Sequence, residues 1–138
     1  MLKLYPNEVK LVFKNFQLQS HKFAKPAAIA ALAAGKQGKF WEMHDAIFEN
    51  YNKLNDAIIN ELAQQIGLDM GKYETDKKNP LLKNQVERDF QIGRAAGVRG
   101  TPTLFVNGRK LKNRSVDGFR QLIDKELSKL KGEAPPYK

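Results

Sequence analysis

Hydrophobic and polar residues alternate in the segment from Val9 to Phe16, which reads Val-Lys-Leu-Val-Phe-Lys-Asn-Phe. A period of two predicts a β-strand with one buried face, and its lysines suit the edge of a sheet. The apolar run from Thr101 to Val106 predicts a second, short and buried strand. Asn107-Gly108 follows this run and is the preferred dipeptide of a type I′ turn, so residues 109–112 are expected to return as the partner strand of a hairpin.

Between these strands, apolar residues recur three and four positions apart, the spacing of amphipathic helices. Asn55 and Ser115 are suited to cap two such helices, and Asn79-Pro80 suits the start of another. The predicted helices cover residues 22–34, 39–51, 55–67, 79–97 and 115–130. The side chains expected on their buried faces are Phe40, Met43, His44, Ile47, Phe48 and Tyr51 in the second helix, Ile58, Leu62 and Ile66 in the third, Leu82, Val86, Phe90 and Gly93 in the fourth, and Phe119, Leu122, Ile123, Leu127 and Leu130 in the last.

The order is therefore a strand, a run of helices, a hairpin and a helix, which predicts an α/β fold with a helical insertion. The first five residues, Met1 to Tyr5, are apolar enough to be the last turn of a helix. Residues 132–138 contain Pro135-Pro136 and are expected to form a mobile tail. The length of 138 residues suggests about one folding unit of ordinary domain size.

The chain holds 24 Lys and Arg against 15 Asp and Glu, a net charge of +9. Such a balance raises nucleic acid or anionic lipid as a partner. In the last predicted helix, however, bases and acids mix at helical spacing, which is typical of a solvated face and argues against nucleic acid. No run approaches the length of a membrane-spanning helix, and no apolar segment precedes the first strand, so neither a membrane span nor a signal peptide is expected.

The sequence contains no cysteine, which excludes disulfides, thiol nucleophiles, iron–sulfur clusters and cysteine-type zinc sites within these residues. Of the two histidines, His44 shares the apolar stripe of its helix and is expected to be structural. His21 lies in a loop without an acid or hydroxyl at motif spacing. A zinc site would need three or four ligands, for which no pattern exists. The sequence therefore predicts no cofactor and no metal.

The most informative segment is the loop that contains Gly100, Thr101 and Pro102. A proline directly before an apolar strand is unusual because it cannot donate to the sheet ladder. A cis Thr101–Pro102 bond would make a tight turn and leave the backbone groups of Thr101 free to pair with an extended peptide. The alternative is an ordinary trans proline in a loop.

This loop and hairpin resemble a known family. Residues 97–108, Gly-Val-Arg-Gly-Thr-Pro-Thr-Leu-Phe-Val-Asn-Gly, are similar to the cis-proline loop and hairpin of DsbA-type thiol–disulfide oxidoreductases in the thioredoxin superfamily. Residues 9–16 resemble the second strand of that family, and residues 26–34 and 38–50 resemble its inserted helical domain. The resemblance covers residues 1–130.

The resemblance implies an incomplete thioredoxin-like domain over residues 1–20 and 97–131, interrupted by a helical domain over residues 21–96. Family members begin with a strand and a Cys-X-X-Cys at the N-terminus of a helix, which lowers the thiol pKa. These residues contain neither cysteine, so no catalytic residue carries over. The cis-proline loop does carry over: in the family it faces the disulfide and holds substrate backbone, which implies a substrate-binding role for Gly100, Thr101 and Pro102.

A missing first strand, with most of the helix after it, would expose two strand edges. We expect the gap to be closed by direct pairing of the flanking strands, by a homodimer that shares elements, or by a segment outside this sequence. The family works mostly outside the cytoplasm, whereas this sequence shows no export signal, so the localisation stays open.

Two functions stay open, and both have proteins or peptides as partners. The first is a fragment or degenerate member of the disulfide oxidoreductase family that is redox-inactive by itself. The second is a cysteine-free, chaperone-like module that binds peptides through the loop at Pro102. Binding of polyanions by the basic surface is a third, weaker interpretation.

Overall fold

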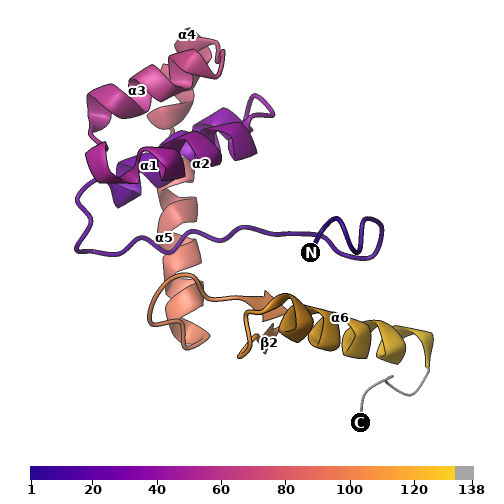
Figure 1. Ribbon diagram of the computed structural model, residues 1–138. Coiled ribbons are helices and arrows are strands. Elements are labelled where there is room, and N and C mark those ends of the chain that lie inside the picture. Colours follow the sequence, from indigo (N-terminus) through magenta and orange to yellow (C-terminus); the bar gives the residue numbers. More distant parts are fainter. Residues whose placement is uncertain (133–138) are drawn as a thin grey trace. The chain divides into compact units, whose positions relative to one another are not determined.

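The computed structural model describes residues 1–132, and the expected tail over residues 133–138 lies outside the described residues. The described chain divides into two compact units. The helical unit is Lys14–Arg99, and the hairpin unit is Met1–Phe13 together with the chain from Gly100 onward. Figure 1 shows the elements, which are α1 (Ala24–Gly35), α2 (Phe40–Glu49), the 3₁₀ turn η1 (Tyr51–Lys53), α3 (Asp56–Gln65), α4 (Met70–Lys77), α5 (Pro80–Ala95), β1 (Phe105–Val106), β2 (Arg109–Lys110) and α6 (Val116–Lys131).

The core of the helical unit forms around α1, which contacts α2, α3, α4 and α5. Five alanines of α1 are buried, and their small side chains let the neighbouring helices approach closely. Larger apolar side chains fill the space between the helices, and Met43, Tyr73 and Val86 are fully buried. Figure 1 shows α1 to α4 grouped at one end of the longer helix α5.

Local capping explains where several helices begin. The side chains of Asn55 and Ser115 accept hydrogen bonds from the backbone N–H groups of Ile58 and Gly118, so both predicted caps are confirmed. Pro80 occupies the first turn of α5, directly after the cap residue Asn79, also as predicted. The short helix α4 was not predicted, although its cap Asp69 was a readable signal.

The hairpin unit contains the only sheet among the described residues, in which Phe105 pairs with Lys110 and Val106 with Arg109. Asn107 and Gly108 both have positive φ, 47° and 77°, which confirms the predicted type I′ turn. At the N-terminus, the expected helical turn is present as hydrogen bonds from the backbone N–H groups of Leu4 and Tyr5 to the carbonyl of Met1. The hydroxyl of Tyr5 donates to the carboxylate of Asp124 on α6 at 2.7 Å.

The predicted strand over Val9–Phe16 is wrong. The described residues 9–18 have no regular secondary structure and pair with no strand. A strand is stable only when a neighbour supplies its hydrogen bonds, and alternation alone provides no neighbour. The sheet is correspondingly smaller than expected, and the family resemblance to an α/β domain is realised here as a mostly helical chain with one short hairpin.

The second strand and two helix faces also differ from the prediction. β1 covers two residues rather than six and is not buried, because it pairs with β2 alone and Phe105 stays 41% exposed. The second helix ends at Glu49, and Phe48 and Tyr51 are exposed instead of buried. Leu130, near the end of α6, is 78% exposed. In the two helices the spacing was helical, but no described element packs over the expected face.

Candidate functional site

The loop before β1 places two of the three predicted site residues at the surface: Thr101 and Pro102 are exposed, and Gly100 is half-buried. The Thr101–Pro102 bond is cis, as predicted. Two side-chain hydrogen bonds hold the loop. The hydroxyl of Thr103 donates to the carbonyl of Gly100 at 2.7 Å, and the guanidinium of Arg114 donates to the carbonyl of Pro102 at 3.3 Å.

The backbone of Thr101 is open to a partner. Within the described residues, neither its N–H nor its carbonyl takes part in a hydrogen bond, whereas the flanking carbonyls of Gly100 and Pro102 are both occupied. Exposed and unpaired backbone groups are those that an added strand can bind. The loop therefore has a donor and an acceptor available on one residue beside a short hairpin.

A charged cluster links the hairpin to α6. The carboxylate of Glu126 accepts from the guanidinium of Arg109 and from the ammonium of Lys129, each at 2.8 Å. The hydrogen bond from Lys129 holds the pKa of Glu126 below its ordinary value, and the charges of Lys129 and Arg109 add to the effect. These ion pairs hold the hairpin strand, and the lowered pKa of Glu126 is not the kind of shift that acid–base catalysis uses.

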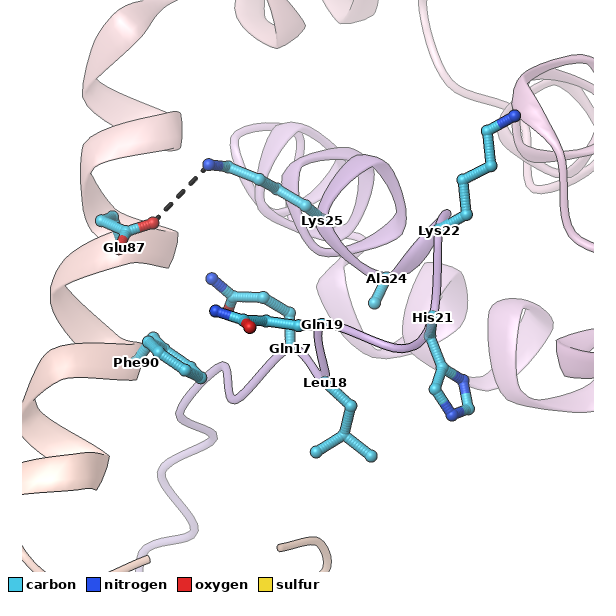
Figure 2. Close-up of a pocket in the computed structure, with 9 residues that line it drawn as sticks. All are labelled: Gln17, Leu18, Gln19, His21, Lys22, Ala24, Lys25, Glu87 and Phe90. Atoms are coloured by element: carbon cyan, nitrogen blue, oxygen red, sulfur yellow. Dashed lines mark ion pairs between the residues drawn. The ribbon is translucent and has the colours of Figure 1, made fainter. Parts of the chain in front are cut away.

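The helical unit contains a pocket of about 270 Å³ between the loop at residues 17–22, the first turn of α1 and the middle of α5. It is lined by Gln17, Leu18, Gln19, His21, Lys22, Ala24, Lys25, Glu87 and Phe90. Figure 2 shows the side chains of Gln17 and Gln19 extending toward the space between Lys25 and Phe90, while His21 and Lys22 point away from it. An ion pair of 3.6 Å joins Lys25 to Glu87 across the pocket.

The segment that enters this pocket is fixed to α5 by a buried carboxylate. Oδ2 of Asp89 accepts from the backbone N–H of Asn15 at 3.0 Å and from its side-chain Nδ2 at 3.1 Å, and both residues are 5% exposed. The ring of Phe16 packs against the ring of Phe90, with centroids 4.8 Å apart and the planes tilted by 32°. It also occupies the space beside Gly93, where a Cβ would come within 2.8 Å of Phe16. This packing holds residues 15–17 in one place.

The histidines form no catalytic or metal site with one another. His44 is half-buried, as predicted, and its Nδ1 lies 3.0 Å from the carboxylate of Asp45. His21 lines the rim of the pocket. Among the described residues, no group of three or more His, Asp or Glu side chains could hold a metal ion. None of the helices in residues 1–132 has the length and apolar character needed to cross a membrane.

Comparison with known proteins identifies the family. The profile described as "Thioredoxin" matches residues 3–125, which is most of the chain. The chain belongs to this thioredoxin family. The result agrees with the resemblance to DsbA-like domains, and a thioredoxin-family chain without cysteine has no Cys-X-X-Cys redox site within these residues.

Similar thioredoxin-family sequences occur in two kinds of protein. The "Probable disulfide bond formation protein D" of Bacillus cereus is 30% identical over 131 residues, which cover 88% of this chain and 60% of that protein. The "Na(+)/H(+) antiporter NhaA 3" of Salinispora tropica is 34% identical over 103 residues, 74% of this chain and 16% of the antiporter. The antiporter of Herminiimonas arsenicoxydans is 36% identical over 95 residues, 69% of this chain. The chain thus spans about one sixth of the antiporters it matches.

Sequence reasoning missed the pocket and its supporting carboxylate. Asp89 was not predicted as a site residue, although its place on the same stripe as Val86 and Phe90 marks an acid on a buried face. Gln17 and Gln19 carried no sequence signal of a pocket. The residues of α5 that complete it, such as Glu87, lie about 70 positions further along the chain, and only the fold brings them together.

Proposed function

We propose that this chain is the polypeptide-binding part of a DsbA-like thiol–disulfide oxidoreductase, and that it binds extended substrate at Gly100, Thr101 and Pro102 without exchanging disulfides itself. The observation that supports binding most directly is the exposed Thr101, whose backbone N–H and carbonyl have no partner among the described residues. Two hydrogen bonds to one residue of an extended chain would satisfy both groups, as in strand addition.

The redox half of the proposal follows from composition and family together. Disulfide exchange requires a thiolate, and these residues contain no cysteine. The matched relative named for disulfide bond formation supports an oxidoreductase context, in which the cysteines would lie outside these residues. The similarity to antiporters covers 16% of one such protein and supports a shared domain rather than a shared transport activity.

Amide hydrogen exchange of the ¹⁵N-labelled chain tests the binding step. The probe is reduced, S-methylated insulin B chain, an unstructured polypeptide. The amide of Thr101 should exchange at an unprotected rate in the free chain and slow by about ten-fold or more at saturating probe, since a bound amide opens rarely. The amide of Gly108 in the turn is the matched control and should not change. Unaltered exchange at Thr101 with the probe bound elsewhere would contradict the proposal.

A second assay separates the two functional interpretations. Insulin reduction with dithiothreitol should show no turnover above the blank, because the chain has no thiol. Adding a small dithiol peptide that contains Cys-X-X-Cys should restore no more than the peptide's own rate if the chain is a cysteine-free binding module. A rate above that of the peptide alone would favour the interpretation that the chain is part of an oxidoreductase.

A further inference from the structure

We propose that the polypeptide bound at Thr101 is acidic, and that three basic side chains of the hairpin unit bind its carboxylates. The three are Lys110, Lys112 and Arg114. The inference rests on the proposed binding at the loop and adds the chemical class of the substrate. Its basis is the charge around the loop, because residues 100–116 contain four basic side chains and no acidic one. A surface of one sign attracts a ligand of the opposite sign.

The hairpin places the two lysines on its exposed side. Lys110 pairs with Phe105 across the ladder, and the N–H of Leu111 donates to the carbonyl of Leu104 at 2.8 Å, so the pairing continues toward the loop. Leu111 is buried between its exposed neighbours Lys110 and Lys112, as side chains alternate along an extended chain. The exposed side of the hairpin therefore carries positive charge in the direction of the loop.

Arg114 brings a third positive charge to the loop itself. Its guanidinium donates to the carbonyl of Pro102, the residue directly after Thr101, at 3.3 Å. A guanidinium has several N–H donors, so others remain for a carboxylate. An extended chain that pairs with the backbone of Thr101 passes within reach of this cation.

These three charges are not neutralised by the described part of the chain, in which none of them forms an ion pair. The fourth base of the segment, Arg109, already shares Glu126 with Lys129. Asp117, the nearest acid along the chain, forms no ion pair with a described residue. The carboxylates that the three cations lack would come from a ligand.

Other ligand classes fit this surface less well. The phosphates of a nucleic acid would match the cations, but a phosphodiester backbone offers no N–H group to the open carbonyl of Thr101. A peptide backbone carries both a donor and an acceptor. A neutral polypeptide would leave the cations without partners, and a basic one would be repelled. An acidic polypeptide satisfies both the backbone of the loop and the charges beside it.

A titration with three short capped peptides tests the proposal. They alternate Thr with Glu, with Gln or with Lys, and the amide shift of Thr101 in the ¹⁵N-labelled chain reports binding at the loop. At about 50 mM salt the Glu peptide should bind about ten-fold more tightly than the Gln peptide. At about 0.5 M salt this advantage should fall to about two-fold or less, because exposed charges are screened. The Lys peptide should bind most weakly.

A pair of double variants locates the preference. Lys110→Gln with Lys112→Gln should bind the Gln peptide as before and lose most of the preference for the Glu peptide. The matched control, Lys72→Gln with Lys83→Gln, removes the same charge from exposed positions of the helical unit and should keep the preference. An equal loss in the control would assign the preference to the net charge of the chain and overturn the proposal.

The remaining outcomes separate this inference from the proposed function. Equal binding of the Glu and Gln peptides at Thr101 would overturn the acidic class and leave binding at the loop intact. No shift of Thr101 with any peptide would contradict the proposed function, and this inference with it. A DNA oligonucleotide that shifts the amides of Lys110 and Lys112 more than the Glu peptide does, at equal concentration, would overturn the proposal in favour of a nucleic-acid surface.

Discussion

Removing the carboxylate of Asp89 should destabilise the helical unit more than any exposed substitution on α5. Asp89 accepts two hydrogen bonds from Asn15, and each residue is 5% exposed. In Asp89→Ala both donors would stay buried without an acceptor, at about 1–3 kcal/mol for each group. The ion pair with Lys14 adds little, since that side chain is 62% exposed. We expect the free energy of unfolding to fall by about 2–4 kcal/mol, less than the sum because some water will reach the site.

Urea unfolding followed by the fluorescence of Trp41, the single tryptophan of the chain, measures this loss within the helical unit. Asp89→Asn keeps one acceptor oxygen and should lose about half as much. The control Glu87→Ala removes an exposed acid of the same helix and should change stability by about 0.5 kcal/mol or less. A loss below about 1 kcal/mol for Asp89→Ala, at an unchanged denaturant slope, would refute the idea that this carboxylate holds the segment.

Further predictions concern local packing, titration and assembly. A Cβ at Gly118 would overlap the backbone carbonyl of Asn113, so Gly118→Ala should lower the free energy of unfolding by about 1–3 kcal/mol. In α4, a Cβ at Gly71 meets only ordinary contacts, so Gly71→Ala should raise that free energy by up to about 1 kcal/mol. Equal effects of the two substitutions in denaturant unfolding would contradict this geometry. Burial, with a smaller effect from the charge of Glu74, raises the pKa of Tyr73 to about 12, and its hydroxyl has no partner among the described residues. The stability of the fold should therefore fall as pH rises from about 10 toward about 12. In denaturant unfolding, Tyr73→Phe should remove that loss without destabilising the chain at neutral pH. Because the pKa of Glu126 is lowered, its ion pairs stabilise the fold fully above the ordinary carboxyl pKa, and this stabilisation is lost as pH falls through the lowered pKa. In an NMR titration, Lys129→Gln should raise the pKa of Glu126. An unchanged pKa would exclude Lys129 as the cause. Pairing of two copies through the open edge of β1 predicts twice the chain mass of 15.7 kDa by light scattering, and a monomer mass would exclude it.

Local signals predicted local structure well. Asn55 and Ser115 cap helices because a short polar side chain before an apolar run can accept a nearby backbone N–H, and that interaction spans only three residues. Asn107-Gly108 forms the predicted turn because both residues tolerate positive φ. The family, too, was evident from motifs that are each continuous in the chain, and the match over residues 3–125 confirms it. The division into domains at residues 20 and 97 stays a prediction.

By itself, the sequence determined the starts of α3, α5 and α6, the hairpin turn, the lack of a thiol within these residues and the family. Only the tertiary structure decided the rest. Val9–Phe16 has the pattern of a strand but no strand beside it, so its hydrogen bonds go elsewhere, in part to Asp89. The pocket joins Gln17 to Glu87, far apart in the chain. Pairing partners and cavities depend on contacts between distant segments, and periodicity carries no information about those contacts.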